Sequence, residues 1–325
     1  MRIGLYSITY LGVWYRGEAL TLPELIERAR RFGYDGIEID GKRPHGNPLD
    51  LPPAACREVK ARAADGGVEI YAVAANNDFS SPIPEFREAQ LAYMRDLIRM
   101  TADLGAPVLR VFAAWPGITF TDKGARYDQA EHIWRTTHEK TNPEQTWAWC
   151  RNGLREAARW AGDAGVTLAL QNHPAVILSG GDMLRMIREV DSPHLKACFD
   201  APLARKQGET ADTIEAAAAR IGALQVLTHF GGEYVEVPDG EILEWVRARD
   251  GSVAREDFYA AFTRGMLRIG YTGYTGYELC HMLPEVNGEP AGIDFVDTNA
   301  RLAAEFMRRV IRQAEAAVTA PAGAA

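Results

Sequence analysis

The stretch LALQNHPAV (residues 168–176) begins as an apolar strand and ends abruptly in polar side chains. Residues 168–170 are apolar, Gln, Asn and His occupy residues 171–173, and Pro174 ends the run. A strand that helices cover on both faces is apolar along its length, as this one is before residue 171. In proteins with parallel strands, polar side chains at the carboxyl ends of the strands form the site. The stretch therefore predicts a buried parallel strand that opens onto a site.

Seven other segments are also short, mostly apolar and strand-like, and helix-like segments separate them. Thr21 and Glu24 form a capping-box pattern at the start of the first helical segment, with Pro23 in its first turn. Apolar residues recur there at helical spacing, and Gly33 ends the pattern. The eight expected strands are residues 2–8, 36–40, 68–74, 108–114, 166–172, 195–200, 224–230 and 276–280. The eight expected helices are residues 24–33, 52–67, 84–105, 143–165, 180–190, 209–222, 255–270 and 294–318.

Strict alternation of strands and helices predicts one parallel sheet with crossover helices. Closed on itself, that sheet is a (β/α)8 TIM barrel, an α/β fold. We expect a single barrel domain over residues 1–320 and a disordered tail at residues 321–325. Long loops are expected after strand four (residues 115–142) and strand seven (residues 231–254). An open doubly wound sheet is the alternative, but it needs a glycine-rich phosphate loop that YSITYLGVWYRG (residues 6–17) lacks.

Composition and charge disfavour several classes of protein. The chain has 325 residues, of which 47% are apolar and 25% charged, as in a globular protein with a sizeable core. Its formal net charge of −8 disfavours binding to nucleic acids, which needs a basic face. Four scattered cysteines without a CxxC pair indicate neither a zinc knuckle nor a disulfide scaffold. The N-terminus has no charged segment followed by an apolar one, and no apolar run has membrane-spanning length. We therefore expect a cytoplasmic protein without membrane contact.

Three polar residues lie at the expected ends of neighbouring strands, namely Asp200, His229 and Glu278. In a closed barrel their side chains can converge, and this mixture of carboxylates and imidazole suits Mn²⁺, Mg²⁺, Co²⁺ or Zn²⁺. Each residue alone is more often a cap or a hydrogen-bonded structural residue. Three on successive strands favour one metal site. Arg110, in strand four, belongs either to the strand ends or to the barrel interior.

The chain resembles the xylose-isomerase-like sugar phosphate isomerase/epimerase barrels, from GLYSITY (residues 4–10) and GYDGIEI (residues 33–39) to its last helix. In that family a Glu, an Asp, a His and a second Glu at strand ends hold one divalent metal. The resemblance implies such a site here, with Mn²⁺ as the favoured ion and Co²⁺, Mg²⁺ or Zn²⁺ as alternatives. It also implies that Glu278 is the base that moves a proton beside a sugar carbonyl. The matching residues are Gln171 in LQNH, Asp200 in CFDAP, His229 in LTHFG and Glu278 in YELC.

A sugar-binding wall is expected around this metal site. The resemblance implies that His173 contacts the sugar or supports a group that does, and its neighbour Asn172 belongs to the same strand end. Sugars and flat aglycones stack on aromatic faces, which makes the tryptophans after strands one and four candidate contacts. The expected substrate-binding residues are Asn172, His173, Trp14, Trp115, Glu38 and His281.

Gln171 departs from the family pattern, which has a Glu at this position. Its carbonyl can still ligate a hard cation, but the side chain is neutral and accepts no proton at neutral pH. The site then has two carboxylates at most, which weakens two-base epimerisation and leaves one-base chemistry with Glu278. A replacement acid or base could come from the loop after strand four, where His138 is the candidate for a second catalytic residue and a solvated loop is the alternative.

Two classes of function remain. The first is a metal-dependent enzyme that removes a proton α to the carbonyl of a sugar or keto-sugar. Elimination of a β-substituent would make it a lyase that resembles the catalytic subunit of C-glycoside deglycosidases. Such a subunit cleaves 3-keto C-glycosides and works with a small β-rich subunit. Return of the proton would instead give a keto-sugar isomerase or 3-epimerase. The second class is a non-catalytic sugar-binding or scaffold barrel, for which Gln171 is the best argument.

The expected partner is a small-molecule sugar or glycoside without a phosphate group, because no glycine-rich loop opens a late helix. The resemblance also implies an oligomer, which for the deglycosidase branch would be a hetero-oligomer. A DNA-repair endonuclease of the same fold is disfavoured, because seven histidines are few for a multi-zinc site and the chain is acidic.

Overall fold

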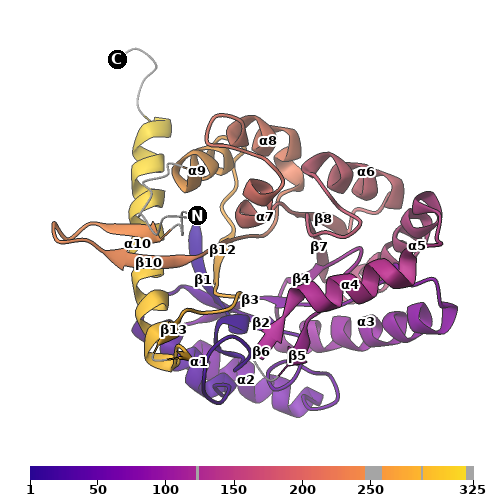
Figure 1. Cartoon of the computed structure of the whole chain (residues 1–325), viewed down its shortest axis with the longest axis horizontal. Helices are drawn as coiled ribbons and strands as arrows, with labels where there is room; N and C mark the ends of the chain where they lie inside the picture. The colour runs from indigo at the N-terminus through magenta and orange to yellow at the C-terminus, as the bar shows by residue number, and fades with distance from the viewer. Residues whose placement is uncertain (122–123, 246–257, 287, 320–325) are drawn as a thin grey trace.

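A computed structural model describes residues 1–121, 124–245, 258–286 and 288–319 (Figure 1). Eight strands form one sheet in the spatial order β8-β7-β4-β3-β2-β1-β12-β9, and all neighbouring pairs are parallel. All eight expected strands are present, and the predicted (β/α)8 barrel is confirmed. The strands are β1 (Arg2–Tyr6), β2 (Gly36–Asp40), β3 (Glu69–Ala74), β4 (Val108–Val111), β7 (Thr167–Gln171), β8 (Leu195–Cys198), β9 (Thr228–Gly231) and β12 (Tyr274–Glu278).

Helices follow the strands in the predicted order. The first begins as the sequence predicts: the Glu24 N–H donates to Thr21 Oγ1 at 3.4 Å, and the Thr21 N–H donates to Glu24 Oε2 at 2.8 Å. The helix expected at residues 209–222 begins later, because Thr213 Oγ1 donates to Glu209 and accepts the Thr210 N–H, which competes with helical hydrogen bonds. The helices are α1 (Leu22–Arg31), α2 (Pro53–Asp65), α3 (Pro84–Leu104), α5 (Pro143–Asp163), α6 (Gly180–Val190), α8 (Ile214–Ile221), α9 (Phe258–Arg268) and α10 (Ile293–Thr319).

The connection after β4 differs from the expected loop. It forms a hairpin of β5 (Thr119–Thr121) and β6 (Gly124–Arg126), followed by helix α4 (Tyr127–His138). Ala130 is the one fully buried residue of α4, so the apolar pattern that would predict this helix is weak. The first residue of the helix anchors it: the Tyr127 hydroxyl donates to the Cys280 carbonyl at 2.8 Å.

The connection after β9 also contains a hairpin, formed by β10 (Glu233–Glu236) and β11 (Ile242–Trp245). The rest of the expected loop, residues 246–254, and the expected tail at residues 321–325 lie outside the described residues. In the part of the chain that the structure describes, no helix combines the length and apolar character needed to span a bilayer. The short elements are η1 (Ser7–Tyr10), α7 (Ala201–Lys206), η2 (Gly222–Leu224), β13 (Glu285–Val286) and β14 (Glu289–Pro290).

The barrel closes between β8 and β9, and this seam is held differently from the other strand pairs. The one backbone bridge described there joins Ala197 to Gln225. The buried side chain of Gln225 accepts the Phe199 N–H at 3.1 Å and donates to the Phe199 carbonyl at 3.3 Å. Thr228 Oγ1 donates to the same carbonyl at 2.8 Å. Side chains therefore close the barrel at this joint, whereas backbone ladders join the other neighbours.

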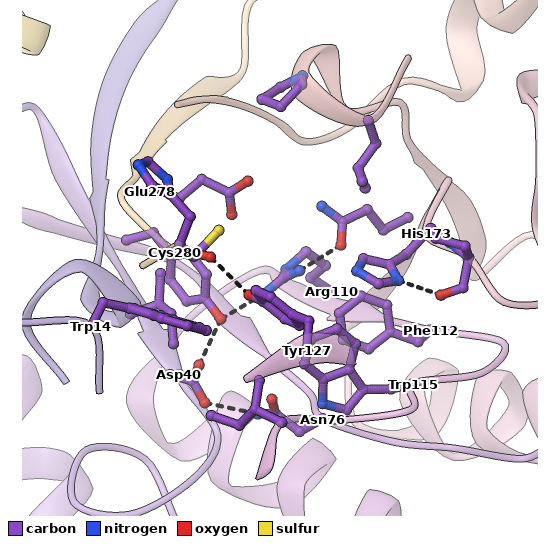
Figure 2. Close-up of a pocket in the computed structure, with 18 of the residues that line it drawn as sticks. Trp14, Asp40, Asn76, Arg110, Phe112, Trp115, Tyr127, His173, Glu278 and Cys280 are labelled. Atoms are coloured by element: carbon purple, nitrogen blue, oxygen red, sulfur yellow. Dashed lines mark hydrogen bonds between the residues drawn. The ribbon is translucent and has the colours of Figure 1, made fainter. Parts of the chain in front are cut away.

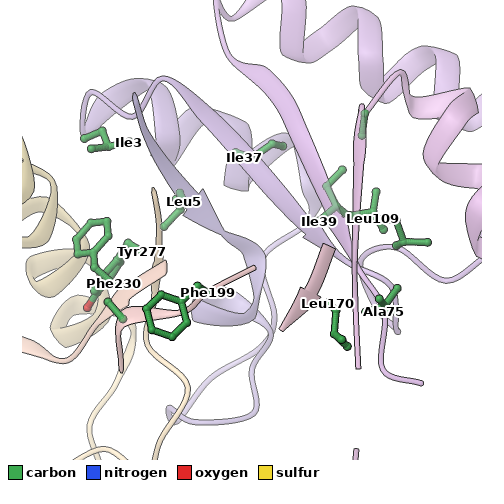
Figure 3. Close-up of a cluster of buried hydrophobic side chains, with 14 of the residues drawn as sticks. Ile3, Leu5, Ile37, Ile39, Ala75, Leu109, Leu170, Phe199, Phe230 and Tyr277 are labelled. Atoms are coloured by element: carbon green, nitrogen blue, oxygen red, sulfur yellow. The ribbon is translucent and has the colours of Figure 1, made fainter. Parts of the chain in front are cut away.

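Apolar side chains cover the strands on both faces of the sheet. An outer layer between sheet and helices contains Leu5, Ile37, Ile39, Leu109 and Leu170, all fully buried (Figure 3). A separate cluster of Tyr71, Ala72, Ala169, Cys198, Leu227 and Tyr274 fills the interior of the barrel.

Glycines make room for this interior. A Cβ atom on Gly4 would lie 2.2 Å from the Tyr71 ring, and one on Gly276 would lie 2.6 Å from the Tyr71 hydroxyl and 2.9 Å from the His229 ring. The packed interior therefore supports the side chains at the strand ends from below.

Candidate active site

Five side chains at the carboxyl ends of five strands form a closed circuit of hydrogen bonds, which we call the polar ring. Arg110 Nη1 donates to Gln171 Oε1 at 2.6 Å, and Gln171 Nε2 donates to Asp200 Oδ2 at 2.8 Å. Arg110 Nε donates to Glu38 Oε1 at 3.1 Å. His229 closes the circuit, with Nε2 at 2.7 Å from Glu38 and Nδ1 at 2.7 Å from Asp200. The polar ring consists of Glu38 on β2, Arg110 on β4, Gln171 on β7, Asp200 after β8 and His229 on β9.

The alternation of side chains along β7 explains how Gln171 reaches the ring. Leu168 and Leu170 belong to the outer layer, whereas Ala169 belongs to the interior cluster. Because side chains of a strand alternate between its faces, Gln171 also points to the interior. Asn172 takes the opposite side and accepts the Asp200 N–H at 2.7 Å. One strand end thus supplies one ring member and fixes the backbone of another.

His229 carries a proton on both ring nitrogens in this arrangement. Each nitrogen faces a carboxylate oxygen, which only accepts hydrogen bonds when ionised. Burial alone would lower the pKa of His229, but the charge of Glu38 and the hydrogen bond to Asp200 raise this pKa well above its usual value. Burial would likewise raise the pKa values of Glu38 and Asp200, yet His229 beside them holds both pKa values below the usual range.

Glu278, at the end of β12, differs from the ring carboxylates. No described residue donates a hydrogen bond to its carboxylate, although the side chain is partly buried and lines the same cavity as Gln171. Burial, followed by the negative charge of Asp200, raises the pKa of Glu278 above its usual value. An unpaired carboxylate with a raised pKa is a stronger base than an ordinary surface glutamate.

A cavity of about 300 Å³ adjoins the polar ring, because Arg110 and Gln171 line it; Figure 2 shows this cavity with Arg110 labelled. Aromatic rings form much of its wall: Trp14 stacks on Tyr127 with ring centroids 5.0 Å apart, and Trp115 stacks on Phe112 at 5.1 Å. The Trp14 Nε1 atom is buried and has no hydrogen-bond partner among the described residues, so it is a donor still available at this wall.

His173 completes the aromatic wall. Its ring lies edge-on to both Trp115 and Phe112, with centroids 4.8 and 5.0 Å away. Nδ1 faces the Pro174 carbonyl, which only accepts, so Nδ1 carries the proton. Burial lowers the pKa of His173 to about 4, so the ring is neutral at pH 7 and Nε2 is an acceptor.

A polar corner lies on the β2 and β3 side of the cavity. The Tyr6 hydroxyl accepts from Arg110 Nη2 at 2.6 Å and donates to Asp40 Oδ2 at 2.7 Å. Asp40 also accepts from Asn76 at 2.7 Å, and Lys42 Nζ lies 3.7 Å from its carboxylate. Tyr6 therefore links the polar ring to a second set of polar groups that line the cavity.

A second hollow of about 400 Å³ adjoins the cavity and shares Trp115, Tyr127 and His173 with it. Trp134 and Leu178 also line this hollow, and Leu178 is 60% exposed although it is apolar. The aromatic wall thus borders the cavity on one side and this second hollow on the other.

Cys198 lies next to the ring and offers a third buried potential ligand. Ligand atoms of Cys198, Asp200 and His229 all lie within 4.8 Å of one another, and Cys198 Sγ is 3.9 Å from His229 Nδ1. Burial raises the pKa of the Cys198 thiol to about 11, so the thiol is neutral at pH 7 and a weak ligand in this state. All four cysteines are free, as the sequence predicts.

The structure brings most of the predicted site residues together. Asp200 and His229 lie in the ring beneath the cavity, both fully buried. Two predicted substrate contacts, Glu38 and Asn172, are also fully buried and hydrogen-bonded within the protein, so neither reaches the cavity. The predicted residues that line the cavity are Gln171, Glu278, Trp14, Trp115, His173 and His281.

His138 is not brought to this cavity. It ends helix α4, where Nδ1 lies 2.7 Å from the Trp134 carbonyl and Nε2 lies 3.0 Å from the Ser80 carbonyl. Its ring stacks on Trp134 with centroids 4.0 Å apart, and it lines a separate hollow beside Phe86. These contacts turn the imidazole away from Glu278.

Several residues of the site are not assigned to it by the sequence alone. Arg110 was left open between the strand ends and the barrel interior, although it carried a usable signal, because a charged residue within an apolar strand must find a buried partner. Cys198 carried no signal, because the four scattered cysteines form no metal-binding pattern in the sequence. Tyr127 and Phe112 carried no signal, because their contacts with Trp14 and His173 join residues distant in the sequence.

The chain matches the family described as "Xylose isomerase-like TIM barrel" over residues 26–310, and it therefore belongs to this family. No curated protein matched the sequence.

Solved structures share the fold at low identity. D-psicose 3-epimerase from Clostridium cellulolyticum H10, solved with D-tagatose, has 18% identity and a TM-score of 0.68, with 96% of this chain and 99% of that chain covered. L-ribulose 3-epimerase has 17% identity and a TM-score of 0.67, with 99% of each chain covered. The 3-keto-D-glucoside 4-epimerase from E. coli has 18% identity and a TM-score of 0.65, with coverage of 95% and 99%.

Proposed function

We propose that this protein is a divalent-metal-dependent enzyme that acts on a keto-sugar by removing a proton α to its carbonyl group. The carrying observation is Glu278, a carboxylate with a raised pKa and no hydrogen-bond partner among the described residues, beside the Asp200–His229 pair. The isomerase and epimerase type of reaction has the better support, since the structural neighbours named above include 3- and 4-epimerases of sugars.

The types of donor and their charge suit a divalent cation, with Asp200 and His229 already close together and Glu278 in the adjoining cavity wall. Asp200, His229 and Glu278 offer two carboxylates and an imidazole, a mixture that Mn²⁺ accepts well and that Co²⁺, Mg²⁺ and Zn²⁺ also accept. Arg110 offsets the charge of Glu38. If the Nδ1 proton of His229 is lost, the remaining carboxylates of Asp200 and Glu278 leave a formal charge of −2, which one divalent ion balances.

The chain's own residues then have distinct roles. A bound metal ion would polarise the sugar carbonyl and the neighbouring hydroxyl. Glu278 takes the α-proton as the C–H bond breaks, and the electron pair of that bond forms the enolate of the sugar. Because Gln171 accepts no proton, Glu278 is the base at these positions. In an isomerisation it returns this proton to the former carbonyl carbon, while the proton of the neighbouring hydroxyl moves to the former carbonyl oxygen. Epimerisation needs a second proton donor on the opposite face of the sugar.

Elimination from a 3-keto C-glycoside is the second candidate, and the second hollow favours it. A sugar ring in the cavity could extend a flat aglycone past Trp115 and Tyr127 into the apolar space beside Leu178. The enolate would then reform its C=O bond and form a C=C bond between the α- and β-carbons as the bond to the aglycone breaks. The aglycone carbon takes the electron pair of that bond together with the proton that Glu278 removed. This reaction needs one base, which agrees with a glutamine at position 171. A small β-rich partner subunit belongs to this candidate.

Proton exchange in D₂O tests both candidates. The protein with Mn²⁺ is incubated with D-fructose, D-allulose, L-ribulose and 3-keto glucosides, and ¹H NMR follows loss of the α-proton. We expect exchange in at least one sugar, with an isomer or epimer as product; release of an aglycone from a 3-keto C-glycoside would select the elimination. If no sugar exchanges its α-proton while Mn²⁺ is bound, the non-catalytic binding barrel becomes the better interpretation.

A further inference from the structure

We infer that Gln171 positions Asp200 and does not ligate the metal, because Arg110 holds its amide oxygen. The metal would then have three protein ligands, Asp200, His229 and Glu278. This inference rests on the proposed metal site and changes the role that the resemblance implies for Gln171.

Chemistry fixes the orientation of the Gln171 amide. Arg110 Nη1, 2.6 Å away, can only donate, so the atom that faces it must be the amide oxygen. Asp200 Oδ2, 2.8 Å away, is an ionised carboxylate oxygen and only accepts, so the atom that faces it must be the amide nitrogen. A flipped amide would place two donors together on one side and two acceptors on the other.

Arg110 cannot readily release this oxygen. Its side chain is 5% exposed, and its guanidinium also donates to Glu38 at 3.1 Å and to Tyr6 at 2.6 Å. Both partners are anchored in turn, Glu38 by His229 and Tyr6 by Asp40. Three fixed hydrogen bonds therefore hold the guanidinium against Gln171 from inside the barrel.

Charge also opposes ligation by Gln171. A metal ion on the same oxygen would put a second cation on a neutral acceptor that already faces the guanidinium, and the two cations would repel each other in a buried site. The amide nitrogen meets no such conflict, because its hydrogen bond to Asp200 favours the ionised carboxylate that a metal needs. Gln171 thus links the positively charged Arg110 to the negatively charged Asp200 through two hydrogen bonds.

The consequence concerns the substrate. A metal with three protein ligands has one more position open to water and sugar oxygens than a metal with four. The carbonyl and hydroxyl oxygens of a keto-sugar can then both bind while a water stays in place. Gln171 is therefore compatible with a metal site, and it leaves the metal with more coordination positions for water and substrate.

The number of waters on bound Mn²⁺ tests this inference, measured from the relaxation of ¹⁷O-labelled water. Six-coordinate Mn²⁺ with three protein ligands keeps about three waters, and with four it keeps about two. We expect about three in the wild type and the same number in Gln171→Met, with an affinity for Mn²⁺ about 10-fold lower because Asp200 loses its hydrogen bond. Glu278→Ala, which removes a proposed ligand, should add one water.

Gln207→Met is the matched control. Gln207 hydrogen-bonds to Asn172 near the site but is not part of the polar ring, so this variant should bind Mn²⁺ with nearly wild-type affinity. One extra water in Gln171→Met, or only two waters in the wild type, would overturn the inference and leave the metal site intact. A wild type that binds no Mn²⁺ would overturn the metal site and this inference with it. The count in the wild type decides the question even if Gln171→Met fails to fold.

Discussion

The polar ring and the aromatic wall border one cavity, yet they are held in different ways. Each ring side chain has at least two hydrogen-bonding partners within the ring, at 2.6 to 3.1 Å, and comes from the carboxyl end of a barrel strand. The wall consists of rings packed on rings, and Trp115 and Tyr127 come from the connection after β4. The barrel strands therefore fix the polar ring, which contains two of the proposed metal ligands, whereas the connections shape much of the cavity wall. Substitutions in the polar ring and substitutions in the aromatic wall should therefore have different effects on metal binding and on substrate binding.

The largest effect is expected from Glu278→Gln. Loss of the base should lower the α-proton exchange rate by at least about 10³-fold, within the range for removal of a general base. The amide matches the carboxylate in shape, so the thermal melting temperature should change little. Exchange kinetics in D₂O and differential scanning fluorimetry check the two expectations. Exchange at the wild-type rate would show that Glu278 is not the base.

Asp200→Asn should act on the metal. The variant loses a charged ligand and places an amide where His229 and Gln171 now meet a carboxylate, so the affinity for Mn²⁺ should fall at least about 100-fold. Metal analysis of the purified protein and titration with Mn²⁺ measure the loss. Asp182→Asn is a fitting control, because Asp182 also accepts hydrogen bonds at a helix start but lies outside the ring. Equal metal content in both variants would contradict the site.

The pH should change metal binding and the stability of the metal-free protein in opposite directions. Metal binding needs the Nδ1 proton of His229 removed, so below its raised pKa the affinity for Mn²⁺ should fall about 10-fold per pH unit. A histidine whose pKa is raised in the folded state stabilises that state at low pH, and this contribution is lost as pH rises through the raised pKa. Calorimetric titration and melting curves between pH 5.5 and 9 would show both slopes. A pH-independent affinity would exclude His229 as a ligand.

Trp115→Ala should affect substrate and spare the metal. Removal of this ring deletes a stacking surface worth about 1 kcal/mol, so KM for an exchanging sugar should rise about 5- to 10-fold. The affinity for Mn²⁺ should stay within about twofold, because Trp115 has no contact with the polar ring among the described interactions. A larger effect on aryl glycosides than on free sugars would support the use of the second hollow.

His138→Ala should give the smallest change in activity. The imidazole bonds to two backbone carbonyls and faces a separate hollow, so turnover should stay within about twofold of the wild-type rate. Loss of these hydrogen bonds should lower the free energy of unfolding by about 1 kcal/mol. Turnover that becomes slower by two orders of magnitude, with normal stability, would show that α4 moves His138 into the cavity during the reaction.

The sequence predicts the barrel well because each strand and helix carries its own local signal. Apolar strands, the Thr21–Glu24 capping box and glycine at helix ends all act over a few residues. The strand ends also predict where Asp200 and His229 meet. The circuit through Arg110 and Glu38 was not predictable, since it depends on which face of each strand turns inward. Helix α4 escaped prediction because tertiary contacts of Tyr127, and not an apolar stripe, hold it in place.

The joint between β8 and β9 lies between two members of the polar ring. Asp200 follows one edge of this joint and His229 lies on the other, so no backbone ladder sets their separation. Their spacing depends on the Gln225 amide, on Thr228 and on the ring itself. The two candidate ligands thus face each other at the joint where a single backbone bridge, Ala197 to Gln225, is described. A cation bound by both Asp200 and His229 would link the two edges of this joint. Without the cation, the side-chain hydrogen bonds alone would hold the edges together.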